Sequence, residues 1–307
     1  MKRVTVLMGG LSAEREVSLA SGVNCAAALK EAGYAVETLD AGADLATVIA
    51  QLKAQKPDVV FNALHGRFGE DGNIQGVLNL LKIPYTHSGL MASSLAMDKP
   101  VAKRLFETVG LRVPQGKLLS RAEAIAGDPM PRPYVVKPFN EGSSVGVTII
   151  KEGDNAKPFA GIDWPFGDVV LAERFIPGRE LTCGVMGDEA MAVTELRPHS
   201  GFYDYANKYT GGKTDHLIPA PLPADVYAEV QRMAVLAHQA LGCRGVSRSD
   251  FRYDDTGAGG VTEIYLLETN TQPGMTELSL VPEMARHAGI SYPALVSWMV
   301  EHAQCDA

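Results

Sequence analysis

The sequence has few cysteines, and they are widely spaced. No two of them form a CxxC pair, and the four stand at Cys25, Cys183, Cys243 and Cys305. This pattern argues against a disulfide framework and a structural zinc site, and it is typical of proteins that work in the reducing cytosol. We therefore expect a cytoplasmic protein.

Long apolar runs and a surplus of positive charge are also missing. No stretch is long enough to cross a membrane, and the apolar start Val4–Met8 is broken by Gly9 and Gly10, which favours a first β-strand over an export signal. The net charge of −8 disfavours a nucleic-acid or anionic-membrane surface. The 307 residues suffice for two or three domains, and 46% hydrophobic with 21% charged residues is ordinary for a soluble enzyme.

The common nucleotide-binding signatures are absent. There is no GxGxxG motif, and the segment Gly212-Lys213-Thr214 has Asn207 where a P-loop requires glycine. A phosphate ligand would therefore have to be held by local Lys and Arg side chains, backbone N–H groups and metal.

The first third of the chain alternates apolar strands with helices. We expect strands over 4–8, 34–39 and 59–63, separated by helices over 15–32 and 45–53. This βαβαβ order predicts a doubly wound α/β domain with a parallel sheet, ending near residue 97.

Two parts of this domain lie where α/β sheets bind ligands. Glu14 stands near the start of the first helix, where it could be a favourable first-turn carboxylate or could hold a substrate ammonium group. The loop 63–72 contains three glycines, two acids and His65, which is more than a plain turn requires.

The middle of the chain suggests a phosphate-binding flap. Lys137 ends an apolar strand over 134–138, and the loop 141–147 that follows is rich in Gly and Ser. Its backbone N–H groups and hydroxyls could close over phosphates, although a simple β-turn would have the same composition. Lys99, just before a helix over 100–109, could likewise reach a phosphate or be solvated.

Two acids flank the turn at Pro177 and Gly178. Glu173 and Glu180 could accept hydrogen bonds from an adenine amino group or ribose hydroxyls, or they could be surface acids. The polar and aromatic loop 202–214 contains two adjacent glycines, and its length and aromatic side chains favour a functional lid. We expect the remaining helices over 224–241, 282–288 and 293–301.

Oxygen ligands gather at the end of an apolar strand that begins at residue 264. Alternation along the strand sends Glu268 and Asn270 to one face, and Arg248 and Asp250 share a face on a preceding strand. An Arg248–Asp250 ion pair and an asparagine turn would explain these residues without a ligand. Together, however, the three oxygen-bearing side chains favour a Mg²⁺–phosphate site.

These motifs follow one another in a characteristic order along nearly the whole chain. They are Gly9-Gly10, Glu14-Arg15-Glu16-Val17-Ser18, His65-Gly66, Gly69-Glu70-Asp71-Gly72, Met97-Asp98-Lys99, Val136-Lys137-Pro138, Gly142-Ser143-Ser144-Val145-Gly146, Glu173, Glu180, Tyr203-Asp204-Tyr205, Lys208-Tyr209, Arg248, Asp250, Glu268-Thr269-Asn270, Pro273-Gly274-Met275-Thr276 and Ser279-Leu280. The set resembles the D-alanine–D-alanine ligases of the ATP-grasp superfamily. The resemblance implies an α/β substrate domain over 1–97, then an α+β ATP-grasp fold with a small subdomain over 98–179 and a large one over 180–307.

The resemblance also implies the reaction and its ligands. Two D-alanines would be joined to D-alanyl-D-alanine through an acylphosphate, with release of ADP and phosphate, for peptidoglycan precursor synthesis. ATP would be the co-substrate, with two Mg²⁺ ions that Mn²⁺ can replace. The partners would be D-alanine and ATP, with no nucleic acid or membrane, in a homodimer formed through the first domain.

The implied site residues fall into four groups. Catalysis would involve Glu14, Ser143, Tyr209, Arg248 and Gly274, whereas the amino-acid substrates would be bound by Glu14, His65, Arg248, Gly274, Ser279 and Leu280. ATP would be bound by Lys99, Lys137, Ser143, Ser144, Glu173, Ile176, Glu180 and Lys208. The metal ligands would be Asp250, Glu268 and Asn270.

Three rival functions stay open at this point. The first is a D-alanine–D-lactate ligase, against which Tyr209 argues, because Phe at that place accompanies D-lactate in the family that the sequence resembles. The second is another ATP-grasp carboxylate–amine ligase, which Glu14, Ser279 and Leu280 would distinguish. The third is an ATP-binding regulator without turnover, which Arg248 and the metal ligands disfavour.

Overall fold

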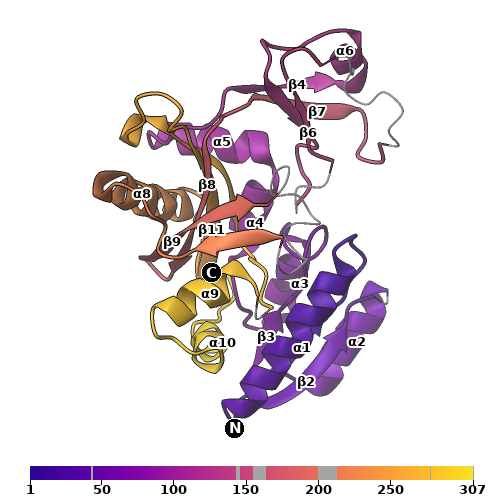
Figure 1. The fold of residues 1–307 in the computed structure, drawn as a ribbon. Coiled ribbons are helices and arrows are strands. Elements are labelled where there is room, and N and C mark those ends of the chain that lie inside the picture. Colours follow the sequence, from indigo (N-terminus) through magenta and orange to yellow (C-terminus); the bar gives the residue numbers. More distant parts are fainter. Residues whose placement is uncertain (43, 143–145, 155–163, 200–212, 277, 307) are drawn as a thin grey trace.

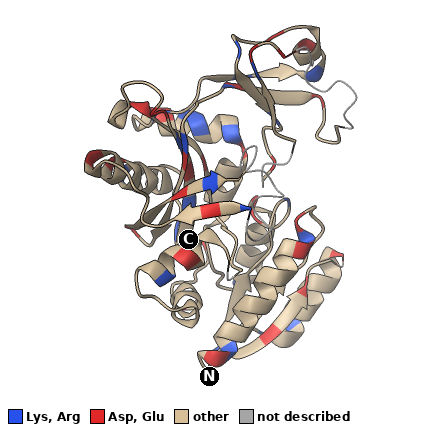
Figure 2. Cartoon of the chain, viewed as in Figure 1, with Lys and Arg blue, Asp and Glu red and all other residues tan. Residues whose placement is uncertain are grey.

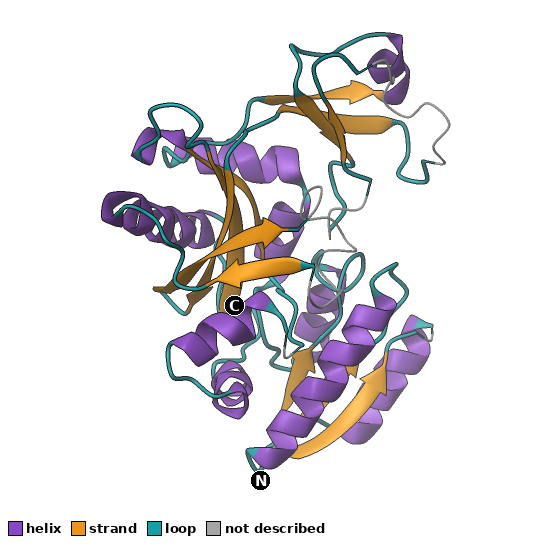
Figure 3. Cartoon of the chain, in the orientation of Figure 1, coloured by secondary structure: helices purple, strands orange, loops and turns teal. Residues whose placement is uncertain are grey.

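Three β-sheets lie in succession along the described part of the chain, each with its own helices (Figure 1 and Figure 3). The computed structural model describes residues 1–307 except 43, 143–145, 155–163, 200–212, 277 and 307. Within the described ranges, no helix is both long and apolar enough to cross a membrane.

The first sheet is parallel and doubly wound, as the sequence predicts. The strand β1 (Arg3–Met8) lies between β2 (Ala35–Asp40) and β3 (Val59–Asn62). The helices α1 (Arg15–Glu31) and α2 (Leu45–Gln55) connect these strands within two residues of the expected bounds.

Alternate residues of β1 bury against opposite layers of helices. Val4 and Val6 belong to a core with Leu29 of α1, whereas Leu7 packs in a second core with Leu52 of α2. This alternation gives a short sheet two apolar faces, which explains its continuous apolar strands.

Three helices follow the first sheet. They are α3 (Asn73–Leu81), α4 (Leu90–Met97) and α5 (Lys99–Thr108). Only α5 was expected from the sequence. Asp98 separates α4 from α5 and caps the latter, because its carboxylate accepts a hydrogen bond from the N–H of Val101.

The second sheet is antiparallel, in the order β4-β7-β5-β6. Its strands are β4 (Gly116–Ser120), β5 (Tyr134–Lys137), β6 (Thr148–Ile150) and β7 (Val169–Arg174). The helix α6 (Arg121–Ala126) packs on it within a stretch where the sequence analysis expected no element. Ser120 and Glu123 form a reciprocal capping box at its start, a signal that the sequence contains as Ser-x-x-Glu.

The third sheet is also antiparallel, in the order β10-β9-β8-β11-β12. Its strands and the short helix η1 are β8 (Arg179–Met186), β9 (Glu189–Pro198), β10 (Thr214–Leu217), β11 (Val246–Tyr253), η1 (Val261–Glu263) and β12 (Ile264–Asn270). Apolar residues of α8 (Ala224–Ala240) cover one face. The helices α9 (Leu280–His287) and α10 (Tyr292–Glu301) pack toward the other face and join it to α1.

Candidate active site

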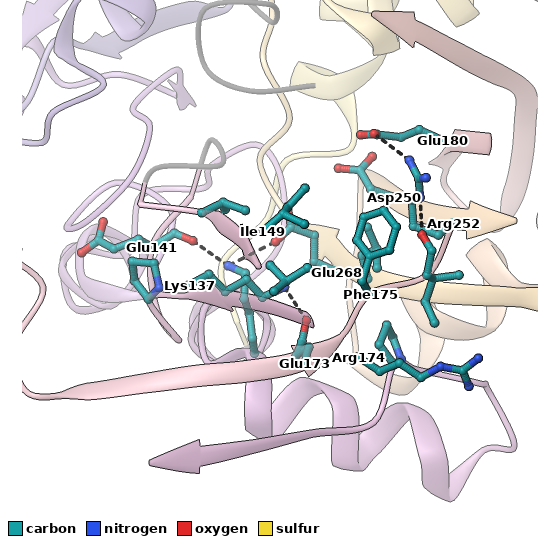
Figure 4. A pocket seen from close by; sticks show the side chains of 17 residues that line it. Lys137, Glu141, Ile149, Glu173, Arg174, Phe175, Glu180, Asp250, Arg252 and Glu268 are labelled. Atoms are coloured by element: carbon teal, nitrogen blue, oxygen red, sulfur yellow. Dashed lines mark hydrogen bonds and ion pairs between the residues drawn. The ribbon is translucent and has the colours of Figure 1, made fainter. Parts of the chain in front are cut away.

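A cleft opens between the second and third sheets (Figure 4). Strands β5, β6 and β7 supply one wall, β8, β11 and β12 supply the other, and the start of α5 closes one end. Its lining includes seven of the residues selected from the sequence, namely Lys99, Lys137, Glu173, Ile176, Glu180, Asp250 and Glu268. Residues far apart in the sequence thus meet in one cleft.

Lys99 connects three elements at one end of the cleft. As the first residue of α5, it is oriented by the Asp98 cap beside it. Its Nζ lies 3.1 Å from Oε2 of Glu268 and donates a hydrogen bond of 2.6 Å to the backbone oxygen of Glu141. The solvated alternative is wrong in this structure, because the Lys99 side chain is buried.

Glu173 lies at the floor of the cleft between two lysines. Lys137 Nζ is 2.7 Å from its Oε2, and Lys103 Nζ donates to its Oε1. Burial would raise the pKa of Glu173, but these two ammonium groups lower it to about 2. Burial lowers the pKa of Lys103 to about 8, although Glu173 opposes that shift. Glu173 is only 2% exposed, so the surface-acid alternative is wrong for it.

Lys103 is a charged residue of this site that the sequence analysis missed. It stands four residues after Lys99 on α5, and that spacing places two side chains on the same face of a helix. The basic residues of α5 stand out in Figure 2. The signal was therefore present as a Lys-x-x-x-Lys spacing.

The other end of the cleft combines an ion pair with apolar side chains. Arg252 Nη1 lies 3.3 Å from Oε2 of Glu180, and its Nε donates to the backbone oxygen of Ile176. Phe175 packs under the same guanidinium, with 5.9 Å between Cζ and the ring centroid. Further apolar walls come from Val135, Ile149 and Leu267. A flat aromatic base could be held between such surfaces.

The predicted oxygen ligands stand on the two neighbouring strands β11 and β12. Asp250 pairs in register with Glu268, and Arg248 pairs with Asn270. The hydroxyl of Thr269 is hydrogen-bonded to that of Ser249 in the buried layer behind them. The side-chain alternation predicted for these strands is therefore confirmed.

Asp250 has several partners. Its oxygens accept hydrogen bonds from Arg248 Nη2 at 2.8 Å, Asn270 Nδ2 at 3.2 Å and Thr182 Oγ1 at 2.7 Å. The Arg248–Asp250 ion pair is thus real, but it lies within the oxygen cluster and does not exclude it. Asn270 is the last residue of the edge strand β12, so the asparagine-turn alternative stays open. Among the described residues, no three His, Cys, Asp or Glu side chains form a metal cluster, and this group has two carboxylates and one amide.

Carboxylates from the first domain converge on Gly142. Gly142 has no side chain, and a Cβ atom added to it would lie 3.1 Å from Oε1 of Glu14 and 3.3 Å from Oε1 of Glu70. Both carboxylates are therefore close to this glycine. Burial and the charge of Glu14 raise the pKa of Glu70 to about 8, while Lys99 and Glu268 are also close enough to influence it. Glu70 was seen in the sequence only as part of an acidic loop, and only the fold brings it to Glu14.

His65 lies buried behind these carboxylates. Its Nε2 is 3.1 Å from the hydroxyl of Ser21 on α1, and that hydroxyl also accepts the N–H of Met275. Burial and the nearby charge of Arg248 lower the pKa of His65 to about 4, so it is neutral at pH 7.

The loop after β12 is tied to the end of β3. Gln272 accepts a hydrogen bond of 2.7 Å from Asn62 Nδ2 and donates to the backbone oxygen of Leu64. These contacts position Gly274, where a Cβ would approach the hydroxyl of Ser279 to 3.0 Å. Gln272 carried no signal in the sequence analysis, because a single glutamine in a loop has no pattern.

Ser279 and Leu280 stand at the start of α9, as expected. Ser279 is the N-cap residue, and its hydroxyl accepts the N–H of Thr276 at 2.9 Å. Leu280 is buried as the first residue of the helix. The backbone N–H groups of such a helix start favour an anion such as a carboxylate.

Four predicted residues of the site lie outside the described ranges. They are Ser143, Ser144, Lys208 and Tyr209.

Comparison with known proteins supports one family across the chain. The family model for the D-ala D-ala ligase N-terminus matches residues 40–88, and the model for the D-ala D-ala ligase C-terminus matches residues 106–301. The chain belongs to the D-alanine–D-alanine ligase family. The resemblance seen in the sequence is thereby confirmed.

Individual relatives agree along their full length. A D-alanine–D-alanine ligase of Rhodospirillum rubrum is 59% identical over 306 residues, covering 100% of this chain and 99% of that protein. The ligase of Paramagnetospirillum magneticum is 58% identical, covering 99% of each.

The fold agrees with solved ligase structures as well. The Bacillus anthracis D-alanine–D-alanine ligase complexed with ATP has a TM-score of 0.83 at 30% identity, covering 98% of this chain and 97% of that one. A second structure of that enzyme has a TM-score of 0.84 at 32% identity with the same coverage. The expected order of a doubly wound domain and an ATP-grasp fold is confirmed.

Proposed function

We propose that this protein is an ATP-dependent ligase that joins two D-alanines into D-alanyl-D-alanine for peptidoglycan precursor synthesis. The observation that carries the proposal is the position of the Lys99–Glu268 pair. It lines the cleft and also lies near Glu70 of the first domain, which in turn lies near Glu14. A phosphoryl group bound there would be adjacent to an amino-acid substrate.

ATP occupies the cleft in this proposal. Lys99 and Lys137 contact its phosphates, while Glu173, Ile176 and Glu180 face the adenosine. These side chains line one cavity, in which Lys99 lies beside Glu268 and the ring of Phe175 lies beside the Arg252–Glu180 pair. Ser143, Ser144 and Lys208 complete the phosphate contacts by family resemblance.

The side chains of Asp250, Glu268 and Asn270 fit a hard divalent cation. They place two carboxylates and one amide on adjacent strands, and carboxylate and amide oxygens are ligands that Mg²⁺ prefers. We propose two Mg²⁺ ions, replaceable by Mn²⁺, which Asp250, Glu268 and Asn270 would hold. When bound, the ions would neutralise charge on the transferring phosphoryl group.

The amino-acid substrates bind between the first and third sheets. Glu14 holds the ammonium group of the first D-alanine, beside His65, and the start of α9 at Ser279 and Leu280 takes the carboxylate of the second. Arg248 and the N–H of Gly274 stabilise the oxyanion that develops during amide formation. Ser143 and Tyr209 would join Glu14 in a hydrogen-bonded set by family resemblance.

The reaction proceeds in two transfers. An oxygen of the first D-alanine carboxylate attacks the γ-phosphorus of ATP, which forms an acylphosphate and releases ADP. The amine of the second D-alanine then attacks the acyl carbon, and the C–O bond to phosphate breaks with release of inorganic phosphate. A free carboxylate is a poor acyl donor, so the phosphoryl group supplies the leaving group.

Further features of the assembly belong to the proposal. We place the domain limits at 1–97, 98–179 and 180–307, since each range contains one of the three sheets. We also propose that the protein works in the cytoplasm as a homodimer formed through the first domain. Leu80 and Met91, on α3 and α4 of that domain, are 86% and 71% exposed and suit such a contact.

The decisive experiment measures phosphate release from Mg-ATP. The assay compares no addition, D-alanine, L-alanine, and D-alanine with D-lactate, and it identifies the products by mass. Release that requires D-alanine and yields the dipeptide supports the proposal. Dominant formation of D-alanyl-D-lactate would instead support a D-lactate ligase, and no D-alanine-dependent release would refute ligation of D-alanine.

A further inference from the structure

The floor of the nucleotide cleft contains one carboxylate and two cations. Glu173 of β7 is approached through Oε1 by Lys103 of α5 and through Oε2 by Lys137 of β5. All three are strongly withdrawn from solvent, with side-chain exposures of 3%, 9% and 11% respectively. A buried group of this kind carries a surplus positive charge, which favours the binding of an anion.

The two lysines differ in their access to the cleft. Lys137 lines the cavity together with Glu173, whereas Lys103 approaches the same carboxylate from α5 and is not part of the lining. A nucleotide phosphate that enters the cleft would therefore meet Lys137, which lines the cavity, before Lys103, which does not. If Lys137 turns to that phosphate, Glu173 loses one of its two partners in a buried site, where an unpaired charge is costly.

We propose that Lys103 is a positioning residue that holds Glu173 while Lys137 changes partner from Glu173 to a phosphate of the nucleotide. Lys103 keeps Oε1 of Glu173 bound, so the carboxylate stays ionised and oriented. Its Oε2 is then available to accept a hydrogen bond from the nucleotide. The inference rests on the proposed function and adds a residue that the function above does not use.

A purely structural role for Lys103 predicts something different. In that case its loss would lower stability and affect all ligands alike. In the exchange described here, its loss leaves Glu173 with Lys137 as its sole lysine partner among the described residues. The carboxylate then competes with the phosphate for Lys137, and only nucleotide binding weakens. Removing the charge of Glu173 removes that competition.

The test compares four variants with the wild type. They are K103M, E173Q, the double variant K103M/E173Q, and R104M as a control at an exposed basic position on the same helix. Calorimetry gives the dissociation constant of Mg-ADP. Phosphate release gives kcat and the KM values for ATP and for D-alanine. Thermal unfolding gives Tm. K103M is expected to raise the dissociation constant of Mg-ADP and the KM for ATP about tenfold to hundredfold, as for loss of one partner of a buried charge pair.

The expected pattern is specific to the nucleotide. The KM of K103M for D-alanine stays within about twofold of the wild type, and R104M behaves like the wild type. Adding K103M to E173Q weakens Mg-ADP binding by less than about twofold, because no carboxylate competes for Lys137. This last comparison decides the question even if K103M alone does not fold.

Three results would overturn the inference. They are an unchanged nucleotide affinity in K103M, equal losses for ATP and D-alanine, and independent, multiplicative effects of K103M and E173Q. Each of these leaves the proposed function intact as long as the wild type makes the dipeptide. A wild type that binds no nucleotide would refute the function and the inference together.

Discussion

Lys99 and Glu268 lie 3.1 Å apart, Nζ to Oε2, at the junction of α5, β12 and the loop that begins after β5. The same ammonium group donates to the backbone oxygen of Glu141, so one side chain links the carboxylate proposed for the metal with the segment proposed to cover the phosphates. The proposed ligase chemistry depends on this junction, because phosphate, cation and amino acid would meet there.

We expect Glu268→Ala to reduce kcat by about 100-fold or more while the protein stays folded. The substitution removes a proposed metal ligand that is needed for phosphoryl transfer. The measurement is dipeptide formation over a range of Mg²⁺ concentrations, with Tm as a check on folding. Glu263→Ala, just before the same strand, is the matched control and should retain wild-type activity. Wild-type-like turnover of Glu268→Ala would refute the metal assignment.

Tyr209→Phe is expected to raise the use of D-lactate relative to D-alanine. Tyr209 lies outside the described residues, so this prediction rests on the resemblance of the sequence to its family. The ratio of D-alanyl-D-lactate to D-alanyl-D-alanine is measured by mass in a mixture of both acceptors. An unchanged ratio would contradict a role of this residue in choosing the second substrate.

The protein should lose stability as the pH falls below about 6.5, the unfolded-state pKa of histidine. Burial, with a smaller effect of His65, lowers the pKa of His87 to about 3 in the folded protein. Between about pH 6.5 and 3, the histidine is therefore protonated in the unfolded chain but stays neutral in the folded protein. The free energy of unfolding then falls by up to about 1.4 kcal/mol for each pH unit. Above pH 6.5 the histidine is neutral in both states, so the folded protein keeps its full stability with respect to His87.

The matched variants for this pH effect are His87→Asn and His287→Asn. His87 has φ of +69°, a conformation that asparagine tolerates, and the hydroxyl of Thr86 lies 3.1 Å from its Nδ1. His87→Asn should flatten the dependence of Tm on pH between 6.5 and 4, whereas replacement of the exposed His287 should leave it unchanged. Identical profiles for wild type and His87→Asn would show that His87 does not contribute.

The C-terminal Asp306 should contribute strongly to stability. Its carboxylate pairs with Arg244 and accepts hydrogen bonds from Asn79 Nδ2 at 2.8 Å and the N–H of Leu90 at 2.8 Å. We expect Asp306→Ala to lower the free energy of unfolding by about 2–4 kcal/mol, because several charge-assisted hydrogen bonds are lost together.

The readout for Asp306→Ala is Tm, compared with Asp255→Ala in an exposed turn. The KM for ATP should stay close to that of the wild type, since Asp306 is not among the residues that line the cleft. Equal Tm values for the two variants would show that the contacts of Asp306 with Asn79 and Leu90 do not stabilise the protein.

Much of the site could be located from local sequence patterns. The alternation of Arg248 with Asp250 and of Glu268 with Asn270 depends only on the geometry of a strand, so the shared faces were predictable before any fold was known. Lys99 was likewise recognisable from the Asp98 cap and the helix that follows it. Lys103 carried a usable helical spacing but no motif, and it was missed.

Other features could not be read from the sequence. Val135, Ile149 and Phe175 look like ordinary core residues of apolar strands, and only the arrangement of the sheets exposes them to the cleft. Gln272 has no pattern at all, yet it ties the loop after β12 to the end of β3.

Local order along the chain thus determined the first sheet, the two strands of the proposed metal ligands, the faces on which their charged residues lie and the family, whereas α3, α4 and α6 were not recognised. Tertiary structure alone decided which charges meet. Glu70 comes to Glu14 beside Gly142, and Glu173 comes between Lys103 and Lys137, through contacts of residues separated by tens of positions. The physical reason is that alternation and helical spacing act over a few residues, whereas burial and pairing of charges depend on how whole sheets pack.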